Sequence, residues 1–336
     1  MASARLMMTN RAVKINKDGT LAELSNELAD MTYCEHGKGA VDNPANWTAI
    51  PRKDFVARLT EIAGAFPVVP DEDNEDQKHV SVFIHGFNNS WKDSVKRYEK
   101  IRSSLYDERD LGQLILFAWP SNGSSAGYLP DREDARACAE ALAQEFKDLH
   151  DRLTIMQEVA VKTQDPSKIC RAKLSIIAHS MGNYVAQKAL AVAARRLNSP
   201  QMLTLITQLV MVAADVDNDI FQRDKPQDAD GSLMANVCYR IGALYTGLDQ
   251  VLGASAGLKH FGTRRLGRSG LADRNNVWDN VFDVDVTSVI KKTDVHSAVF
   301  DSPRAMALLE QVLRGVDRQH LKLPAEPTVT QPGKAA

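Results

Sequence analysis

Short, almost continuously apolar segments alternate with amphipathic helical segments through most of this chain. The apolar segments are residues 80–84, 114–118, 174–178 and 209–213, and further strand-like segments follow at 237–245 and 281–286. Strands that are apolar on both faces belong to parallel sheets whose two faces are both covered. The helical segments are residues 91–105, 132–161 (one bent helix or two), 183–197 and 303–316. This alternation predicts an α/β fold with a mostly parallel central sheet and helices on both faces.

The same alternation predicts how the chain is divided. No internal repeat interrupts it, so we expect a single domain over residues 1–320 of the 336. Residues 1–75 form an N-terminal extension that is harder to interpret, with an edge strand expected at 5–9 and a helix at 54–65. The proline-containing segment 321–336 is expected to be a disordered tail.

Charge and hydropathy exclude several classes of partner. The chain has 41 basic and 43 acidic side chains, so there is no electrostatic reason to expect nucleic acid. Its N-terminal apolar run is too short for a signal peptide, and no stretch approaches the ~18 apolar residues of a membrane span. We therefore expect a cytoplasmic protein without integral membrane association.

The cysteines are scattered rather than grouped. They are Cys34, Cys138, Cys170 and Cys238. Zinc sites use closely spaced pairs of cysteines, and small secreted proteins use dense disulfide frameworks. We therefore expect reduced thiols and neither a metal nor an organic cofactor.

Residues 178–182, Ala-His-Ser-Met-Gly, connect an apolar strand to an Ala-rich helix. A nucleophile elbow needs this strand–turn–helix context, and it needs small residues two positions before and after the serine, here Ala178 and Gly182. The turn would expose Oγ of Ser180 and aim the N–H of Met181 at a developing oxyanion. The alternative is an ordinary serine at a helix N-cap.

A second loop predicts the other oxyanion donor. The strand at 80–84 ends in His-Gly-Phe-Asn-Asn, residues 85–89. A His-Gly pair after this strand is the usual position of the second donor, and Gly86 lets the backbone approach the substrate closely. The N–H of Phe87 would then act together with that of Met181.

Two further histidines lie near these turns. His85 precedes the serine in the sequence, so we expect it to support the oxyanion loop by hydrogen bonding rather than to act as a base. His179 is adjacent to Ser180, but side chains alternate along a strand, so we expect it to point to the other side and to be structural.

A serine hydroxyl needs a base to become a nucleophile, and the base needs an orienting acid. In elbow-type hydrolases the chain order is Ser, then Asp or Glu, then His. Three histidines follow Ser180: His260, His296 and His320. His296 lies between the last strand and the closing helix, where the base belongs, and nearby Asp294 is expected to shape that loop.

Two aspartates compete for the role of the acid. Asp249 follows the strand at 237–245, and Asp217 follows the strand at 209–213. The acid usually follows the later strand, so Asp249 is preferred and Asp217 is kept as the alternative.

Taken together, these segments resemble a bacterial α/β-hydrolase family of unknown function. The segments that carry the resemblance are residues 82–89, 117–121, 178–183, 212–217, 265–267 and 294–297. The resemblance extends over roughly residues 75–305 and implies an α/β-hydrolase fold with a Ser180–Asp249–His296 triad. Ala214 stands where family members often have proline, a difference that says little about catalysis.

The spacing also predicts the shape of the site. Only about two dozen residues separate Asp215 from Val237, where caps commonly insert, so any cap is small or absent. Trp119 and Tyr128, with His85, are candidates for lining the substrate site. Packing roles are the alternative for the two aromatic residues.

The function predicted from the sequence is that of a serine hydrolase. It would cleave carboxylic esters, small-molecule or lipid-like, through an acyl-serine. A lipase, a thioesterase or a peptidase would use the same residues. An alternative from another functional class is a binding module that has this fold but no catalytic turnover. The sequence leaves the oligomeric state open.

Overall fold

The computed structural model describes residues 4–67, 69–121, 128–165, 172–197, 204–259, 262–291 and 293–325. In chain order, the strands of this part are β1 (Leu6–Ile15), β2 (Leu21–His36), β3 (Trp47–Ile50), β4 (His79–Ile84), β5 (Gly112–Ala118), β6 (Lys173–His179), β7 (Ile206–Val212), β8 (Cys238–Tyr245) and β9 (Val281–Asp285). They form a nine-stranded sheet in the order β3-β2-β1-β5-β4-β6-β7-β8-β9.

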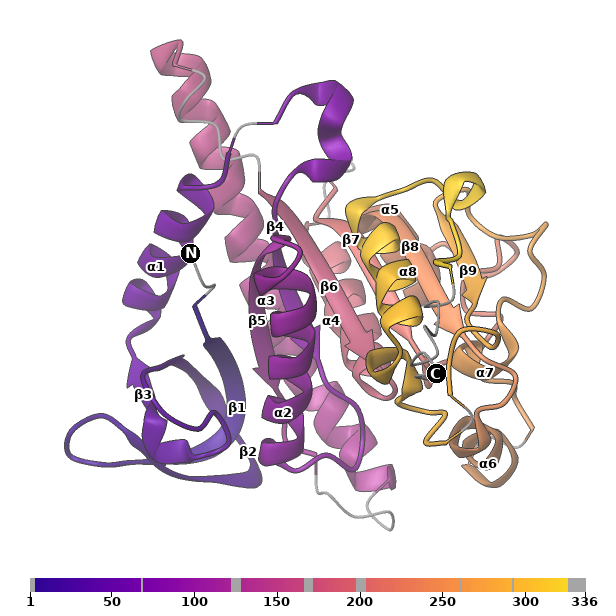
Figure 1. Cartoon of the computed structure of the whole chain (residues 1–336), viewed down its shortest axis with the longest axis horizontal. Coiled ribbons are helices and arrows are strands. Elements are labelled where there is room, and N and C mark those ends of the chain that lie inside the picture. Colours follow the sequence, from indigo (N-terminus) through magenta and orange to yellow (C-terminus); the bar gives the residue numbers. More distant parts are fainter. Residues whose placement is uncertain are drawn as a thin grey trace, which may run out of the picture.

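From β1 to β9 across the sheet, every neighbouring pair of strands is parallel. β4 and β6 are buried along their whole length, as their apolar sequences predicted. The carboxyl ends of the parallel strands therefore lie along one edge of the sheet, the lower edge in Figure 1. In open α/β sheets, sites form at this edge.

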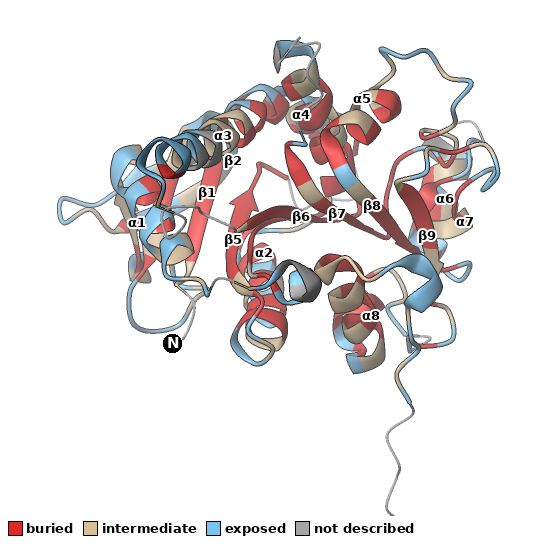
Figure 2. Ribbon diagram, turned by 90° about the horizontal axis from the view of Figure 1, so that it is seen from above, coloured by how far each residue is buried: buried red, intermediate tan, exposed pale blue. Residues whose placement is uncertain are grey.

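The helices cover both faces of the sheet. They are α1 (Arg52–Gly64), α2 (Trp91–Ile101), α3 (Tyr128–Thr163), α4 (Gly182–Leu197), α5 (Asp230–Val237), α6 (Gln250–Lys259), α7 (Leu266–Ser269) and α8 (Pro303–Arg314). α1, α3, α4 and α5 lie on one face, and α2 and α8 lie on the other (Figure 2). A buried apolar cluster fills the space on each face. The predicted fold class, a mostly parallel sheet between helices, is confirmed.

Local signals explain where several helices begin and end. α2 begins with a capping box, in which Ser90 and Asp93 each bond the backbone N–H of the other. α2 ends earlier than expected and continues as a π-helical turn, Arg102–Asp107. The segment at 132–161 lies within one long helix, α3, and α5 lies in the stretch of sequence between Asp215 and Val237 where a cap was considered.

The prediction of an edge strand at residues 5–9 is wrong. β1 lies inside the sheet, parallel to β5 on one side and antiparallel to β2 on the other. The edge strand is β3, which pairs with β2. Residues 6–50 therefore contribute the strands β1, β2 and β3 to the central sheet. β2 has no clear strand pattern in the sequence, because its middle is exposed and its apolar residues do not alternate with polar ones.

The last described residues lie against α8. Gln311 donates to the carbonyl of Lys322 (2.9 Å), and Arg304 donates to that of Pro324 (2.9 Å). Part of the predicted disordered tail is therefore packed, while residues 326–336 lie outside the described part of the chain.

Cysteine state and membrane insertion can be assessed for the described part of the chain. Cys34, Cys138 and Cys238 are buried and unbridged, and Cys170 lies outside the described residues. None of the described helices combines the length and apolar character that a bilayer span requires.

Candidate active site

Ser180 occupies the tight turn between β6 and α4. Its φ is +52°, in the left-handed region that a residue with a Cβ rarely adopts. The surrounding backbone holds this conformation. The N–H of Ser180 donates to the carbonyl of Val212 (3.0 Å), and its own carbonyl accepts from the N–H groups of Asn183 (3.1 Å) and Asp215 (3.2 Å). Strain that is fixed in this way is common at functional sites.

The buried side chain of Asn183 stabilises the turn by hydrogen bonds to three backbone carbonyls. Its amide donates to the carbonyls of Ala178 (3.1 Å), Ser180 (3.1 Å) and Val212 (3.2 Å). Sequence reasoning missed this role. The available signal was a polar residue in the first turn of an Ala-rich helix, where a buried amide needs partners.

The loop after β4 lies directly against the elbow. A Cβ at Gly86 would come within 2.8 Å of the Cβ of Ser180. A Cβ at Gly182 would come within 2.5 Å of the carbonyl oxygens of Ile84 and His85. Both positions therefore require glycine, since real Cβ atoms do not approach so closely.

A hydrogen-bonded chain links three side chains from three loops. Oγ of Ser180 lies 2.9 Å from Nε2 of His296, and Nδ1 of His296 lies 2.7 Å from Oδ2 of Asp249. Asp249 is fully buried, and its Oδ1 accepts from the N–H of Leu252 (3.0 Å). A carboxylate at Nδ1 makes that nitrogen the donor and leaves Nε2 free to accept the serine proton.

The alternative acid points elsewhere. The side chain of Asp217 is 50 % exposed and forms an ion pair with Arg265. The structure therefore brings Asp249, and not Asp217, to His296.

Arg265 belongs to a buried polar cluster that sequence reasoning did not foresee. Its Nε donates to Oδ1 of Asp215 (2.8 Å), which also accepts from the hydroxyl of Ser255 (3.0 Å). Tyr128 donates to the other carboxylate oxygen of Asp215 (2.8 Å). The signal in the sequence was a pair of aspartates after a strand, which need a cation when they are buried.

The predicted oxyanion loop, residues 85–89 after β4, is held by its own side chains. The amide of Asn89 donates to the carbonyls of Gly86 (3.0 Å) and Phe87 (2.9 Å). Nδ1 of His85 lies 2.9 Å from the carbonyl of Gly86, which makes this nitrogen the donor. The side chain of Phe87 is partly exposed, and that of Met181 is buried beneath the elbow.

His85 and Trp119 form a buried pair behind this loop. Their rings are stacked at 5.3 Å, and Nε1 of Trp119 donates to the carbonyl of His85 (2.7 Å). Burial, reinforced by the charge of Arg11, lowers the pKa of His85 to about 3. His85 is therefore neutral and braces the backbone.

Tyr128 connects the oxyanion loop to the Asp215 cluster. Its ring meets that of Phe87 edge to face at 5.5 Å, while its hydroxyl bonds Asp215. Tyr128, Trp119 and His85 are all buried. Whether any of them lines a bound substrate stays a prediction.

His179 contacts His296, the predicted base. Nε2 of His179 donates to the carbonyl of His296 (3.1 Å), and the two rings lie 5.1 Å apart. Burial, with the neighbouring His296 and Arg97, holds the pKa of His179 well below its usual value. His179 is thus a neutral donor that supports the loop of His296. Asp294 shapes the same loop with a φ of +49°, and its carbonyl accepts from the N–H of Ser297 (3.1 Å).

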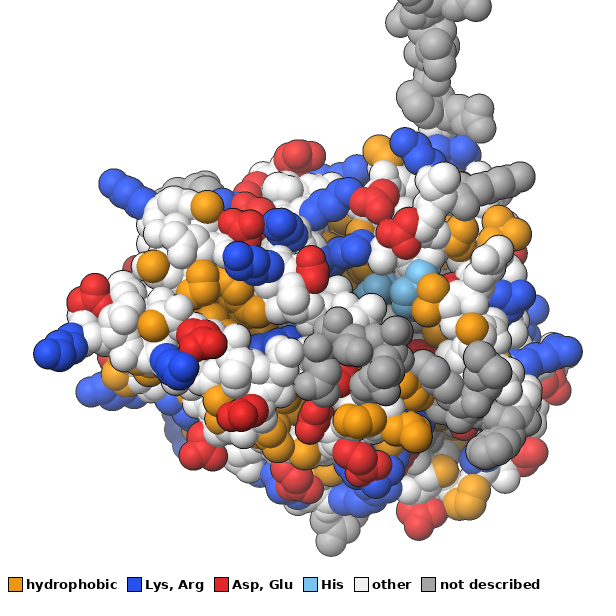
Figure 3. Space-filling model, turned by 90° about the horizontal axis from the view of Figure 1, so that it is seen from below, with side chains coloured by type: hydrophobic (Ala, Val, Ile, Leu, Met, Phe, Trp, Pro, Cys, Tyr) orange, Lys and Arg blue, Asp and Glu red, His pale blue; other side chains and the backbone are white. Residues whose placement is uncertain are grey.

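The face at the carboxyl ends of the strands is shown in Figure 3, where histidine side chains reach the surface beside hydrophobic ones. His296 is the base candidate, with 14 % of its side chain exposed. Among the described residues, no group of three or more His, Cys, Asp or Glu side chains could hold a metal ion.

The parallel sheet and the serine at a strand–turn–helix elbow define an α/β-hydrolase fold. Residues 68–315 match the profile of a family described as an alpha/beta hydrolase of unknown function (DUF900), and the chain belongs to that family. The resemblance predicted from the motifs is therefore confirmed. No curated protein matched the sequence.

Solved structures of distant proteins are also similar to the chain. An esterase from Pyrobaculum calidifontis is 12% identical, with a TM-score of 0.37 over 71% of this chain and 76% of that one. Aspergillus fumigatus lipase B is 12% identical, with a TM-score of 0.38 over 73% and 55%. An acylaminoacyl peptidase from Pyrococcus horikoshii is 14% identical, with a TM-score of 0.32 over 88% and 49%. At these scores the likeness adds nothing to the family assignment.

Proposed function

We propose that this protein is a serine hydrolase that cleaves carboxylic esters through an acyl-serine intermediate. The observation that carries the proposal is the hydrogen-bonded chain from Oγ of Ser180 through His296 to Asp249, at 2.9 and 2.7 Å. Contacts of this length allow a proton to move from the hydroxyl to the imidazole as the hydroxyl attacks.

Each residue has a defined part in the reaction. Oγ of Ser180 attacks the ester carbonyl carbon while Nε2 of His296 accepts its proton. Asp249 stays ionised and stabilises the imidazolium through Nδ1–H. The N–H groups of Phe87 and Met181 bind the oxyanion of the tetrahedral intermediate.

The intermediate then collapses, and the alcohol leaves with the proton held by His296. Water attacks the acyl-serine with His296 again as the base, which releases the acid and restores Ser180. The low pKa of His85 and His179 supports this assignment. Burial disfavours the imidazolium form of both, so neither readily accepts the serine proton.

The test is covalent labelling by a fluorophosphonate probe, which reacts with activated serines. Wild-type protein should be labelled, and Ser180→Ala should lose the label completely. Ser175→Ala is the matched control, because Ser175 lies on the same strand but bonds His79 at the other end of the sheet (2.8 Å). Labelling that persists in Ser180→Ala would contradict the proposal.

The chemical class of the substrate is tested with a panel of p-nitrophenyl esters of increasing acyl length, a thioester and a peptide amide. We expect the esters to be hydrolysed fastest. Strong preference for long acyl chains would identify a lipase. A preference for the thioester or the amide would identify a thioesterase or a peptidase, and labelling without turnover would favour a binding module.

A further inference from the structure

Arg11 is a fully buried arginine that lies outside the part of the chain matched by the family profile. β1 stops pairing with β5 at Thr9, opposite Ala118, and its register against β2 shifts between Thr9 and Arg11. Such a bulge bends a strand and redirects its side chains. β1 therefore continues past the carboxyl end of β5, and Arg11 reaches the loops that form the site.

The guanidinium of Arg11 spans three segments. Nη2 donates to the carbonyls of Asn89 (3.2 Å) and Ser121 (3.4 Å), which lie on the loops after β4 and β5. Nη1 donates to the side chain of Asn26 and to the carbonyl of Ser25 (3.5 Å) on β2. The guanidinium of Arg11 thus links the N-terminal strands to both loops by hydrogen bonds.

Both loop carbonyls belong to segments that contact the loop of the proposed oxyanion donor. Asn89 is the residue whose amide bonds the carbonyls of Gly86 and Phe87. Ser121 is two residues after Trp119, whose indole stacks on His85 and bonds its carbonyl. Arg11 therefore holds the two segments that fix the direction of the Phe87 N–H.

Burying a cation costs desolvation free energy, so stability alone does not explain why Arg11 is charged. Burial lowers the pKa of Arg11 to about 10, and the charge of Asp131 partly offsets this effect, so Arg11 stays charged near neutral pH. An apolar side chain of similar size often stabilises a core as well as a buried charge does. What an apolar side chain cannot supply is a rigid fork of donors at fixed angles.

We propose that Arg11 is a positioning residue for the oxyanion loop, contributed by the N-terminal strands. It acts through Asn89 and Ser121 and does not touch the substrate. The inference rests on the proposed function, because it concerns the same serine chemistry.

The test compares Arg11→Met with Arg102→Met. Arg102 is also buried, but it pairs with Glu99 of α2 (3.0 Å) and with Asp107 of the π-helical turn that precedes β5 (2.8 Å). In Arg11→Met we expect kcat for p-nitrophenyl acetate to fall about 10- to 100-fold, with KM within about threefold. The rate of fluorophosphonate labelling should fall in parallel.

Further readouts separate positioning from general loss of stability. Arg102→Met should lower the melting temperature but keep the wild-type kcat. The shape of the pH–rate profile of Arg11→Met should stay that of the wild type, because His296 and Asp249 are untouched. Arg11→Lys, which keeps the charge but loses the fork, should also lose activity.

The outcomes distinguish this inference from the proposed function. If wild type turns over the ester and Arg11→Met and Arg11→Lys match it per folded molecule, the positioning role is wrong and the proposed function stands. If wild type is neither labelled nor active, both are wrong. If Arg11→Met does not fold, kcat is measured for Arg11→Lys and for Asn26→Ala, which changes an exposed partner of Arg11. A lower kcat in both variants supports the positioning role, and a wild-type kcat in both contradicts it.

Discussion

A buried histidine lies at each end of strand β4, and the two histidines contact different parts of the molecule. His79 is its first residue, and His85 follows its last. Both are fully enclosed, and burial lowers the pKa of both. His79 bonds the hydroxyl of Ser175 (2.8 Å), whereas His85 bonds the carbonyl of Gly86 in the oxyanion loop (2.9 Å).

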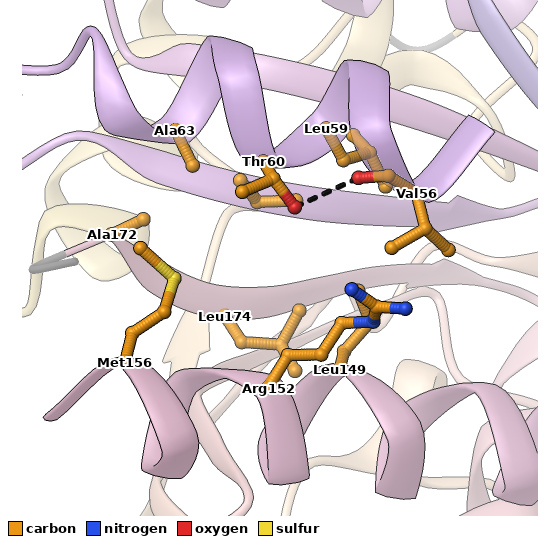
Figure 4. Close-up of a pocket in the computed structure, with 10 residues that line it drawn as sticks. Val56, Leu59, Thr60, Ala63, Leu149, Arg152, Met156, Ala172 and Leu174 are labelled. Carbon is orange, nitrogen blue, oxygen red and sulfur yellow. Dashed lines mark hydrogen bonds between the residues drawn. The ribbon is translucent and has the colours of Figure 1, made fainter. Parts of the chain in front are cut away.

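At the amino end of the sheet, polar groups pair with near neighbours. Lys78 pairs with Asp110 (2.7 Å), and Lys173 donates to the carbonyl of Asn74. Beside them, between α1 and α3, lies an apolar cavity of about 50 Å³. Figure 4 shows aliphatic side chains from both helices and from the start of β6 around it, with Arg152 at its side.

At the carboxyl end, polar groups from separate loops converge on one hydroxyl. Ser180, His296 and Asp249 are far apart in the sequence but form one hydrogen-bonded chain. Burial of a histidine therefore does not identify a site by itself. What distinguishes the carboxyl end is that side chains from separate loops form one chain to a single hydroxyl.

The largest expected effect separates the two candidate acids. Asp249→Asn should lower kcat for p-nitrophenyl acetate by about 10³-fold or more, because the amide favours the wrong imidazole tautomer. Asp217→Asn, half exposed and bonded to Arg265, should stay within about threefold of wild type. Steady-state kinetics of both variants measures the difference, and the reverse order would mean that Asp217 is the acid.

The next effect concerns stability rather than chemistry. Arg265→Met leaves the buried carboxylate of Asp215 without its cation, so the free energy of unfolding should fall by about 3–5 kcal/mol. The control is Arg223→Met, whose partner Asp279 is 98 % exposed, with an expected loss below about 1 kcal/mol. Urea unfolding compares them, and equal losses would show that the Asp215 cluster is no more stabilising than a surface pair.

Much of the fold was predictable because its central strands are continuously apolar. β4, β5, β6 and β7 lie where the apolar segments placed them, within one or two residues at most ends. β2 was not predictable, because this strand near the sheet edge lacks the alternation of apolar and polar residues that marks a strand. Its absence from the prediction also placed β1 at an edge, since no partner for its outer side was foreseen.

The site was predictable to the extent that chain order and strand ends determine it. Position after a strand predicts Ser180 and His296, and it favours Asp249 as the acid without excluding Asp217. Which aspartate meets the imidazole depends on packing between distant segments. The same holds for Arg11 and Arg265, since nothing in the sequence shows that a particular arginine is buried.

The smallest effect tests the amino end of β4, where His79 should influence stability and not catalysis. Its pKa in the folded protein is well below the usual value because of burial and then the charges of Lys173, Arg314 and Lys78. Below about pH 6.5 the unfolded chain binds a proton at this histidine while the folded protein does not, so stability falls as pH falls. Between pH 7 and pH 5 this costs about 2 kcal/mol for each such histidine.

His79→Gln can still bond Ser175 but cannot titrate, so its free energy of unfolding should fall less between pH 7 and pH 5 than that of wild type. His320→Gln is the control for the substitution itself, because His320 is exposed on the surface. Urea unfolding at the two pH values measures the difference, and kcat at pH 7 should be the same in all three proteins. An unchanged pH dependence in His79→Gln would show that His79 takes up a proton in the folded state. A loss of kcat would show that the two ends of β4 are coupled.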